Sequence, residues 1–82
     1  MFINKSPDGR NNICGARLAR LRTQKGISQR ELADILQRLG LDVDKNAVQR
    51  IESGQRFVTD IELVFLAKAF GVSVSDLLFN PN

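Results

Sequence analysis

The 82-residue sequence contains one cysteine, Cys14, and it has no histidine, tryptophan or tyrosine. A disulfide within the chain is therefore impossible, a Cys/His metal site is almost excluded, and no histidine can serve as a catalytic base. The longest apolar run, residues 63–67, is far short of the roughly 20 residues that span a bilayer. Polar residues follow Phe2 and Ile3 at once, unlike a signal peptide. We expect a cytoplasmic protein with no metal, no cofactor and no membrane partner.

What is present is the composition of a single globular domain. Hydrophobic residues make up 43% of the chain and charged residues 26%, which is typical of a folded protein of this size. The charge is uneven: residues 1–56 hold eleven Lys/Arg and six Asp/Glu, whereas residues 57–82 hold one Lys and three acidic residues. This asymmetry favours an oriented contact with an anionic partner, although an ordinary basic surface is the alternative.

Glycines and capping residues divide the chain into five expected helices, and no segment alternates as a half-buried strand does. Residues 1–11 have no periodicity and are interpreted as a flexible N-terminal arm, so the domain covers residues 12–80. Capping boxes precede the second and fourth helices, and Asn12 and Asp44 are candidate caps of the first and third. The expected helices span residues 12–25, 28–39, 44–53, 59–70 and 73–79, which predicts an all-α fold.

The second and third expected helices are joined by a short turn that contains Gly40, the arrangement of a helix-turn-helix unit. In that unit the second helix lies in the DNA major groove. The third expected helix has one apolar side and one side of Asn, Gln, Lys and Arg, the residue types that pair with adenine and guanine edges. The candidate base-contacting residues are Lys45, Asn46, Gln49 and Arg50. A solvated helix face, which is often rich in the same residues, is the alternative.

Four blocks of the sequence resemble the lambda-repressor-like, Xre-type helix-turn-helix domain. They are RLARLR at 17–22, GISQRELA at 26–33, VQRIESG at 48–54 and LAKAFGVS at 66–73. The resemblance covers residues 15–78 and implies a five-helix fold in which helices two and three form the helix-turn-helix. One departure is a spacing of fifteen residues between Gln29 and Lys45, where family members usually have about ten; the extra residues lengthen helix two or widen the turn.

The resemblance also implies roles for individual residues. Gln29 matches a glutamine that bonds a DNA phosphate and braces the recognition helix, and Arg22 and Glu52 match a structural ion pair between helices one and three. The loop after the recognition helix matches one that presents backbone N–H groups to the DNA backbone. That loop comprises Gly54, Gln55, Arg56 and Phe57.

The fourth expected helix is apolar almost all round, which is unusual for a helix with only one buried side. Either the arm covers its surplus residues with Phe2 and Ile3, or a second subunit covers them in a homodimer, with Phe65, Leu77 and Phe79 as interface candidates. We favour the dimer, because two half-sites double the contacts to DNA.

These features predict a sequence-specific DNA-binding transcriptional regulator of prokaryotic or phage origin, whose partner is double-stranded DNA. The alternative is a protein-interaction module on the same fold, such as the antitoxin of a toxin–antitoxin pair. An enzyme is not expected, because the sequence shows no phosphate-binding loop, no metal cluster and no convergent catalytic pair.

Overall fold

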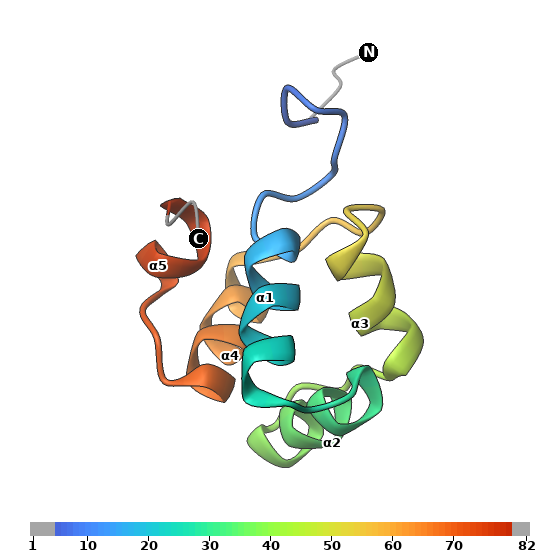
Figure 1. Ribbon diagram of the computed structural model, residues 1–82, viewed down its shortest axis with the longest axis vertical. Helices are drawn as coiled ribbons and strands as arrows, with labels where there is room; N and C mark the ends of the chain where they lie inside the picture. Colours follow the sequence, from blue (N-terminus) through green and yellow to red (C-terminus); the bar gives the residue numbers. More distant parts are fainter. Residues whose placement is uncertain (1–4, 80–82) are drawn as a thin grey trace.

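The computed structural model describes residues 5–79. Over these residues the fold consists of five helices (Figure 1). They are α1 (Gly15–Lys25), α2 (Gln29–Leu39), α3 (Lys45–Glu52), α4 (Asp60–Phe70) and α5 (Val74–Phe79). The described residues contain no strand. The predicted all-α, five-helix architecture is therefore confirmed, with α2 and α3 in the positions expected for the helix-turn-helix.

Local capping fixes most of the helix boundaries. The Ser28 hydroxyl accepts a hydrogen bond from the Glu31 N–H at 3.0 Å, and the Glu31 carboxylate accepts one from the Ser28 N–H at 2.9 Å. Thr59 and Glu62 form the same reciprocal box at the start of α4. Both capping boxes predicted from the sequence are confirmed, and each satisfies two N–H groups that the helix itself cannot.

The predicted start of the first helix was wrong by two residues. The helix begins at Gly15 and not directly after Asn12. The Asn12 side-chain oxygen does accept a hydrogen bond from the Gly15 N–H at 2.8 Å, but the Asn12 amide nitrogen donates to backbone carbonyls of residues 51 and 56. Asn12 therefore joins the start of α1 to the end of α3, because its two side-chain atoms have different partners.

The hydrophobic core lies where α1, α2, α3 and α4 converge. In Figure 1, α1 lies between α3 and α5, and α2 closes the lower end of the molecule. The packing contacts join α2 to α3 and α4, and α1 to α3 and α5. Residues from all five helices have no more than 1% of their surface exposed: Leu18, Leu32, Leu36, Val48, Ile51, Leu66 and Leu77.

Cys14 behaves as a small hydrophobic residue at the entrance to α1. Its side chain is buried in the core. Burial in apolar surroundings raises the pKa of the Cys14 thiol to about 11, because a thiolate there would lose its hydration. A neutral thiol at physiological pH disfavours a redox-sensing role for this residue.

A five-residue connector joins α2 to α3. It covers residues 40–44, begins with Gly40 in the left-handed conformation (φ 109°) and ends at Asp44, which caps α3 by accepting a hydrogen bond from the Ala47 N–H at 2.8 Å. Val43 is buried with 5% of its surface exposed, and its carbonyl accepts a hydrogen bond from Gln37 Nε2 at 2.7 Å. The connector is therefore a turn anchored to the core.

The N-terminal segment differs from a free arm over its described part. Ser6 and Arg10 close a turn, in which the Ser6 N–H donates to the Arg10 carbonyl and the Arg10 N–H donates to the Ser6 hydroxyl. Residues 10–12 then bond to the C-terminal end of α3. The proposed cover of α4 by Phe2 and Ile3 lies outside the described residues.

We predict that Val43→Ala destabilises the protein more than Leu39→Ala, although the second change removes more carbon atoms. Val43 is buried, whereas Leu39 is 41% exposed. The first change should lower the free energy of unfolding by about 2 kcal/mol and the second by less than about 1 kcal/mol. Urea denaturation followed by circular dichroism measures both. Equal effects would show that the connector is not anchored through Val43.

Candidate nucleic-acid interface

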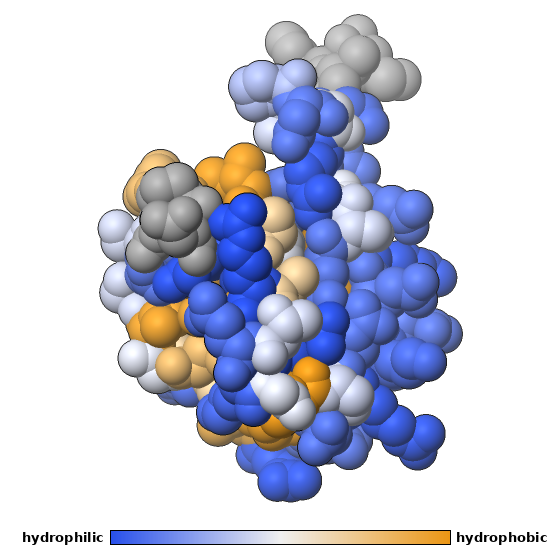
Figure 2. Space-filling model, in the orientation of Figure 1, coloured by the Kyte–Doolittle hydropathy of each residue, from blue (hydrophilic) through white to orange (hydrophobic). Residues whose placement is uncertain are grey.

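One side of α3 is polar and open to solvent. Lys45, Asn46, Gln49 and Arg50 are all exposed, as the two-faced pattern of the sequence predicted. On the opposite side Val48 and Ile51 are completely buried in the core. The region of α3 in Figure 2 has a hydrophilic surface, in contrast to the apolar patches near α4 and α5. The exposed side of α3 therefore presents four donor side chains and no carboxylate.

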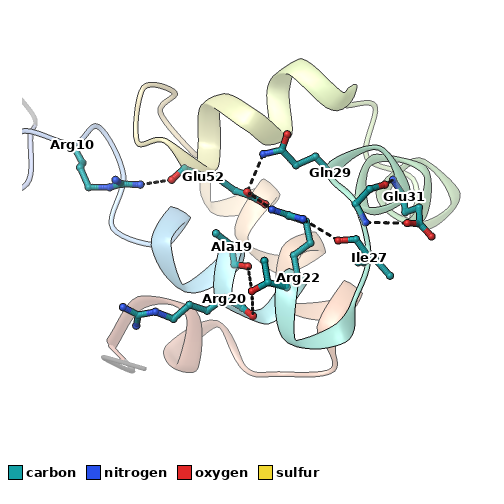
Figure 3. Close-up of polar contacts among 10 residues, drawn as sticks. Arg10, Ala19, Arg20, Arg22, Ile27, Gln29, Glu31 and Glu52 are labelled. Carbon is teal, nitrogen blue, oxygen red and sulfur yellow. Dashed lines mark hydrogen bonds and ion pairs between the residues drawn. The ribbon is translucent and has the colours of Figure 1, made fainter.

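Glu52, the last residue of α3, ties this helix to α1 and α2. Its carboxylate lies 2.7 Å from Arg22 Nε and 3.1 Å from Arg22 Nη2, and it accepts a third hydrogen bond from Gln29 Nε2 at 3.0 Å (Figure 3). The side chains of Arg22 and Glu52 are only 17% and 7% exposed. The hydrogen bonds to Glu52 raise the pKa of the Arg22 guanidinium, and the predicted structural ion pair is confirmed.

Gln29 occupies the first position of α2, where the resemblance implies two roles. The bond from its Nε2 to Glu52 shows that it braces α3. An amide nitrogen carries two hydrogens, so a second bond from the same atom to a DNA phosphate is compatible with this brace. The phosphate contact of Gln29 stays a prediction.

The loop after α3 is bonded differently from the expectation. The N–H groups of Gln55 and Arg56 both donate to the Arg50 carbonyl, at 2.9 and 3.2 Å, and the Gly54 N–H donates to the Ile51 carbonyl at 3.1 Å. These three N–H groups cap the end of α3 instead of pointing outward. The idea that they bind the DNA backbone therefore needs correction, and a contact from Gln55 or Arg56 would use the side chain.

Arg56 is held by an ion pair. Its Nη1 lies 2.8 Å from Glu62 Oε2, and the side chains of the two residues are 31% and 13% exposed. Burial by itself would raise the pKa of the Glu62 carboxyl, but the N–H of Thr59 and the guanidinium of Arg56 outweigh it and lower that pKa. The pair connects the loop to α4. Phe57, the last residue of the predicted loop contacts, is 60% exposed.

Sequence reasoning missed three residues next to this surface. Arg10, Asn11 and Asn12 all donate hydrogen bonds to carbonyls at the end of α3 or in the loop that follows it. Asn12 is the only buried polar residue among the described positions. The available signal was the pair Asn11-Asn12 directly before two apolar residues, since an Asn at the edge of a core needs partners for its amide.

The predicted interface residues do not form one surface. Leu77 is 1% exposed and lies in the core of its own chain, so the prediction that it lines a dimer interface is wrong. Phe65 is half-buried beneath Lys68, whose Nζ lies 5.7 Å from the ring centre. Phe79 is 75% exposed, and on α4 the exposed apolar residues are Ile61 (65%) and Val64 (45%).

Two further features of the described residues are their metal-ligating side chains and the lengths of their helices. No group of three or more acidic or cysteine side chains among them is arranged to hold a metal ion. Within residues 5–79 every helix is too short to cross a membrane.

We predict that Arg22→Ala lowers the free energy of unfolding by about 3 kcal/mol, because it leaves the buried Glu52 carboxylate without its cation. The double variant with Glu52→Ala should be no less stable than the single variant, since no uncompensated charge remains. Arg38→Ala, at an exposed position of α2, is the control and should change stability by less than about 0.5 kcal/mol. Thermal and urea unfolding measure all three. A double variant much less stable than Arg22→Ala would contradict this account.

Comparisons with known proteins agree with this geometry. A helix-turn-helix family model matches residues 18–77. The chain is similar to the crystal structure of the restriction-modification controller protein C.AhdI from Aeromonas hydrophila, with 36% identity and a TM-score of 0.68 over 78% of this chain and 89% of that one. It is also similar to the clp gene regulator ClgR from C. glutamicum, with 31% identity and a TM-score of 0.70 over 83% of this chain and 82% of that one.

The hypothetical transcription factor NHTF from Neisseria shares the fold, with a TM-score of 0.75 and 24% identity over 93% of this chain and 82% of that one. A search of curated proteins found no match. The family model covers most of the chain, and the residues that it matches include both α2 and α3. The chain therefore belongs to the helix-turn-helix family of lambda-repressor-like, Xre-type DNA-binding transcriptional regulators.

Proposed function

We propose that this protein is a sequence-specific transcriptional regulator that reads the DNA major groove with α3. The observation that carries the proposal is the exposed polar side of α3, on a helix whose opposite side is buried and whose last residue is bonded to α1 and α2. An α-helix fits the major groove, where each base pair presents a distinct set of donors and acceptors.

The reading residues have the chemistry that base recognition needs. Asn46 and Gln49 can each pair with an adenine edge through two hydrogen bonds, and Lys45 and Arg50 can donate to guanine or to phosphate. Asp44, at the start of α3, already uses its carboxylate to accept a hydrogen bond from the Ala47 N–H. This cap leaves the following side chains to approach the bases.

Contacts to the DNA backbone position the protein, as in other DNA-binding domains. We assign Gln29, Gln55 and Arg56 to this role through their side chains, and the exposed Phe57 is the remaining candidate in the loop. Gly54 is buried against Arg10, so it would act by shaping the loop. Arg56 would have to share its charge between Glu62 and a phosphate, because the Glu62 carboxylate lies 2.8 Å away.

The likeness to C.AhdI and ClgR, which are named as a restriction-modification controller and a gene regulator, supports a prokaryotic or phage origin and a role in controlling transcription. An antitoxin-like protein-interaction module remains the second candidate. The exposed Ile61 and Val64, three residues apart on α4, favour it, because neighbouring apolar side chains that form a surface patch indicate an interaction site.

We also propose that the regulator acts as a homodimer. Ile61 and Val64, three residues apart on α4, and Phe79 on α5 supply the apolar surface that a second copy would bury. A two-fold axis would place two α3 helices on the same side of the DNA, about 34–36 Å apart if the half-sites occupy successive major grooves.

We predict that Asn46→Ala and Gln49→Ala each relax base preference at one or two positions, because each change removes side-chain hydrogen bonds to a base. The expected loss of discrimination is about 1–3 kcal/mol per variant. Binding of each variant to duplexes selected from a random library, and to their single-base variants, measures this loss. If both variants kept the base preference of the unmutated protein, the assignment of the exposed side of α3 as the base-contacting surface would be overturned.

The proposed homodimer leads to a second prediction. Phe79→Glu should give a folded monomer with much weaker operator binding, because a carboxylate would replace a ring buried between subunits. Ile13→Glu is the matched control, since Ile13 is also exposed (53%) but lies before α1, outside the proposed interface. Analytical ultracentrifugation at tens of micromolar measures assembly. A monomeric unmutated protein that shows no assembly on DNA would refute the dimer.

A further inference from the structure

Residues 10 and 11 bond to the carbonyl groups at the end of the proposed reading helix. Arg10 Nη2 donates to the Glu52 carbonyl at 2.5 Å, a contact visible at the side of Glu52 opposite Arg22 (Figure 3). The Asn11 N–H donates to the Gly54 carbonyl at 2.7 Å, and Asn11 Nδ2 donates to the Gln55 carbonyl at 2.8 Å. Two consecutive residues therefore hold three carbonyls at the end of α3 and in the loop that follows it.

Asn12 adds two further bonds from a buried position. Its Nδ2 donates to the Ile51 carbonyl at 3.1 Å and to the Arg56 carbonyl at 2.7 Å. Its oxygen accepts from the Gly15 N–H, so the same side chain is fixed to the start of α1. Together, five of the six carbonyls between residues 51 and 56 accept a hydrogen bond from residues 10–12.

These bonds meet a specific need of a short helix. The last four carbonyls of an α-helix have no partner within it, and its C-terminal end carries a partial negative charge. In α3 the carbonyls of Gln49, Arg50 and Ile51 accept from N–H groups of residues 53–56. Arg10 supplies the partner of the last carbonyl, that of Glu52, and brings a positive charge to this end of the helix. The fit is close at Gly54 (φ 82°), where an added Cβ atom would lie 2.7 Å from Arg10 Nε.

These bonds lie at one end of α3, so they can control the orientation of the exposed side of the helix that is proposed to contact bases. Eight residues of α-helix extend about 12 Å, so a tilt of about 10° at the end of α3 moves its first turn by about 2 Å. Base readout tolerates much less, because hydrogen bonds weaken steeply beyond their normal length and angle. Lys45 and Asn46 lie in that first turn, at the opposite end of α3 from residues 10–12.

We propose that residues 10–12 are a positioning element that sets base discrimination by fixing the orientation of α3 and of the loop at residues 54–57. This inference rests on the proposed reading of DNA by α3. The three residues act through carbonyls at the end of α3 and not by touching bases. Their loss should therefore affect a matched sequence more than an unmatched one.

The test compares two variants of the full chain, Arg10→Gln and Asn11→Ala. Arg10→Gln shortens the side chain and removes its charge, whereas Asn11→Ala removes one hydrogen bond without changing the charge. Arg38→Gln is the matched control, because it removes a charge from an exposed position away from residues 10–12. The probes are the duplex that the unmutated protein selects from a random library and a scrambled duplex of equal composition, each measured at two salt concentrations.

We expect both variants to lower the ratio of matched to scrambled affinity by about 3- to 10-fold, the effect of losing one or two hydrogen bonds. The slope of affinity against salt should stay unchanged for Asn11→Ala, and Arg38→Gln should keep the ratio of the unmutated protein. Amide hydrogen exchange at residues 54–56 should become faster in both variants, because the segment that holds their loop loses hydrogen bonds to α3 or to the loop carbonyls.

Three results would overturn the proposal. An equal loss on both duplexes, with the salt slope reduced by about 1 for Arg10→Gln alone, would make Arg10 a phosphate contact. Lower thermal stability with an unchanged affinity ratio, in a variant that is folded at the assay temperature, would reduce residues 10–12 to a structural role. If the unmutated protein itself selected no sequence, the proposed reading by α3 would fail first, and this inference would fail with it.

Discussion

The position of α3 depends most on Glu52. Its carboxylate joins α3 to α1 through Arg22 and to α2 through Gln29, while its carbonyl receives the guanidinium of Arg10 (Figure 3). Apolar packing through Val48 and Ile51 draws α3 to the core, but such packing is not directional. The buried apolar side sets which face of α3 turns inward, and hydrogen bonds with defined lengths and angles fix its orientation more narrowly.

A domain of 82 residues has a small core. Hydrogen bonds and ion pairs therefore contribute more to holding its helices in place than they would in a larger protein. Arg17 and Asp76 join α1 to α5, and Arg56 and Glu62 join the loop after α3 to α4. The first pair joins the first and last helices of the fold, and the second fixes the loop to the helix that follows it. They hold the helices around the core while leaving the exposed side of α3 unobstructed.

Features set by local chemistry were predictable from the sequence. The capping boxes at Ser28 and Thr59, the cap at Asp44 and the two faces of α3 depend on residues at most four positions apart. The ion pair of Arg22 and Glu52 came only from the resemblance to a known family. The bonds from residues 10–12 join positions about 40 residues apart, and no local rule relates them.

The error at Leu77 has a local explanation as well. Leu77 and Phe79 are two residues apart, and residues with that spacing point to different sides of a helix. When α5 packs Leu77 against the core, Phe79 turns to solvent. The sequence could therefore exclude a shared interface for the two, although it could not show which of them is buried, because that depends on how residues 71–73 direct the chain.

The central claim is that α3 enters the major groove, and dimethyl sulfate footprinting on a selected duplex tests it most directly. Guanine N7 lies in the major groove and adenine N3 lies in the minor groove. The account predicts that bound protein protects guanine N7 within the selected half-site and leaves adenine N3 reactive there. Protection of adenine N3 with unchanged reactivity at guanine N7 would contradict it.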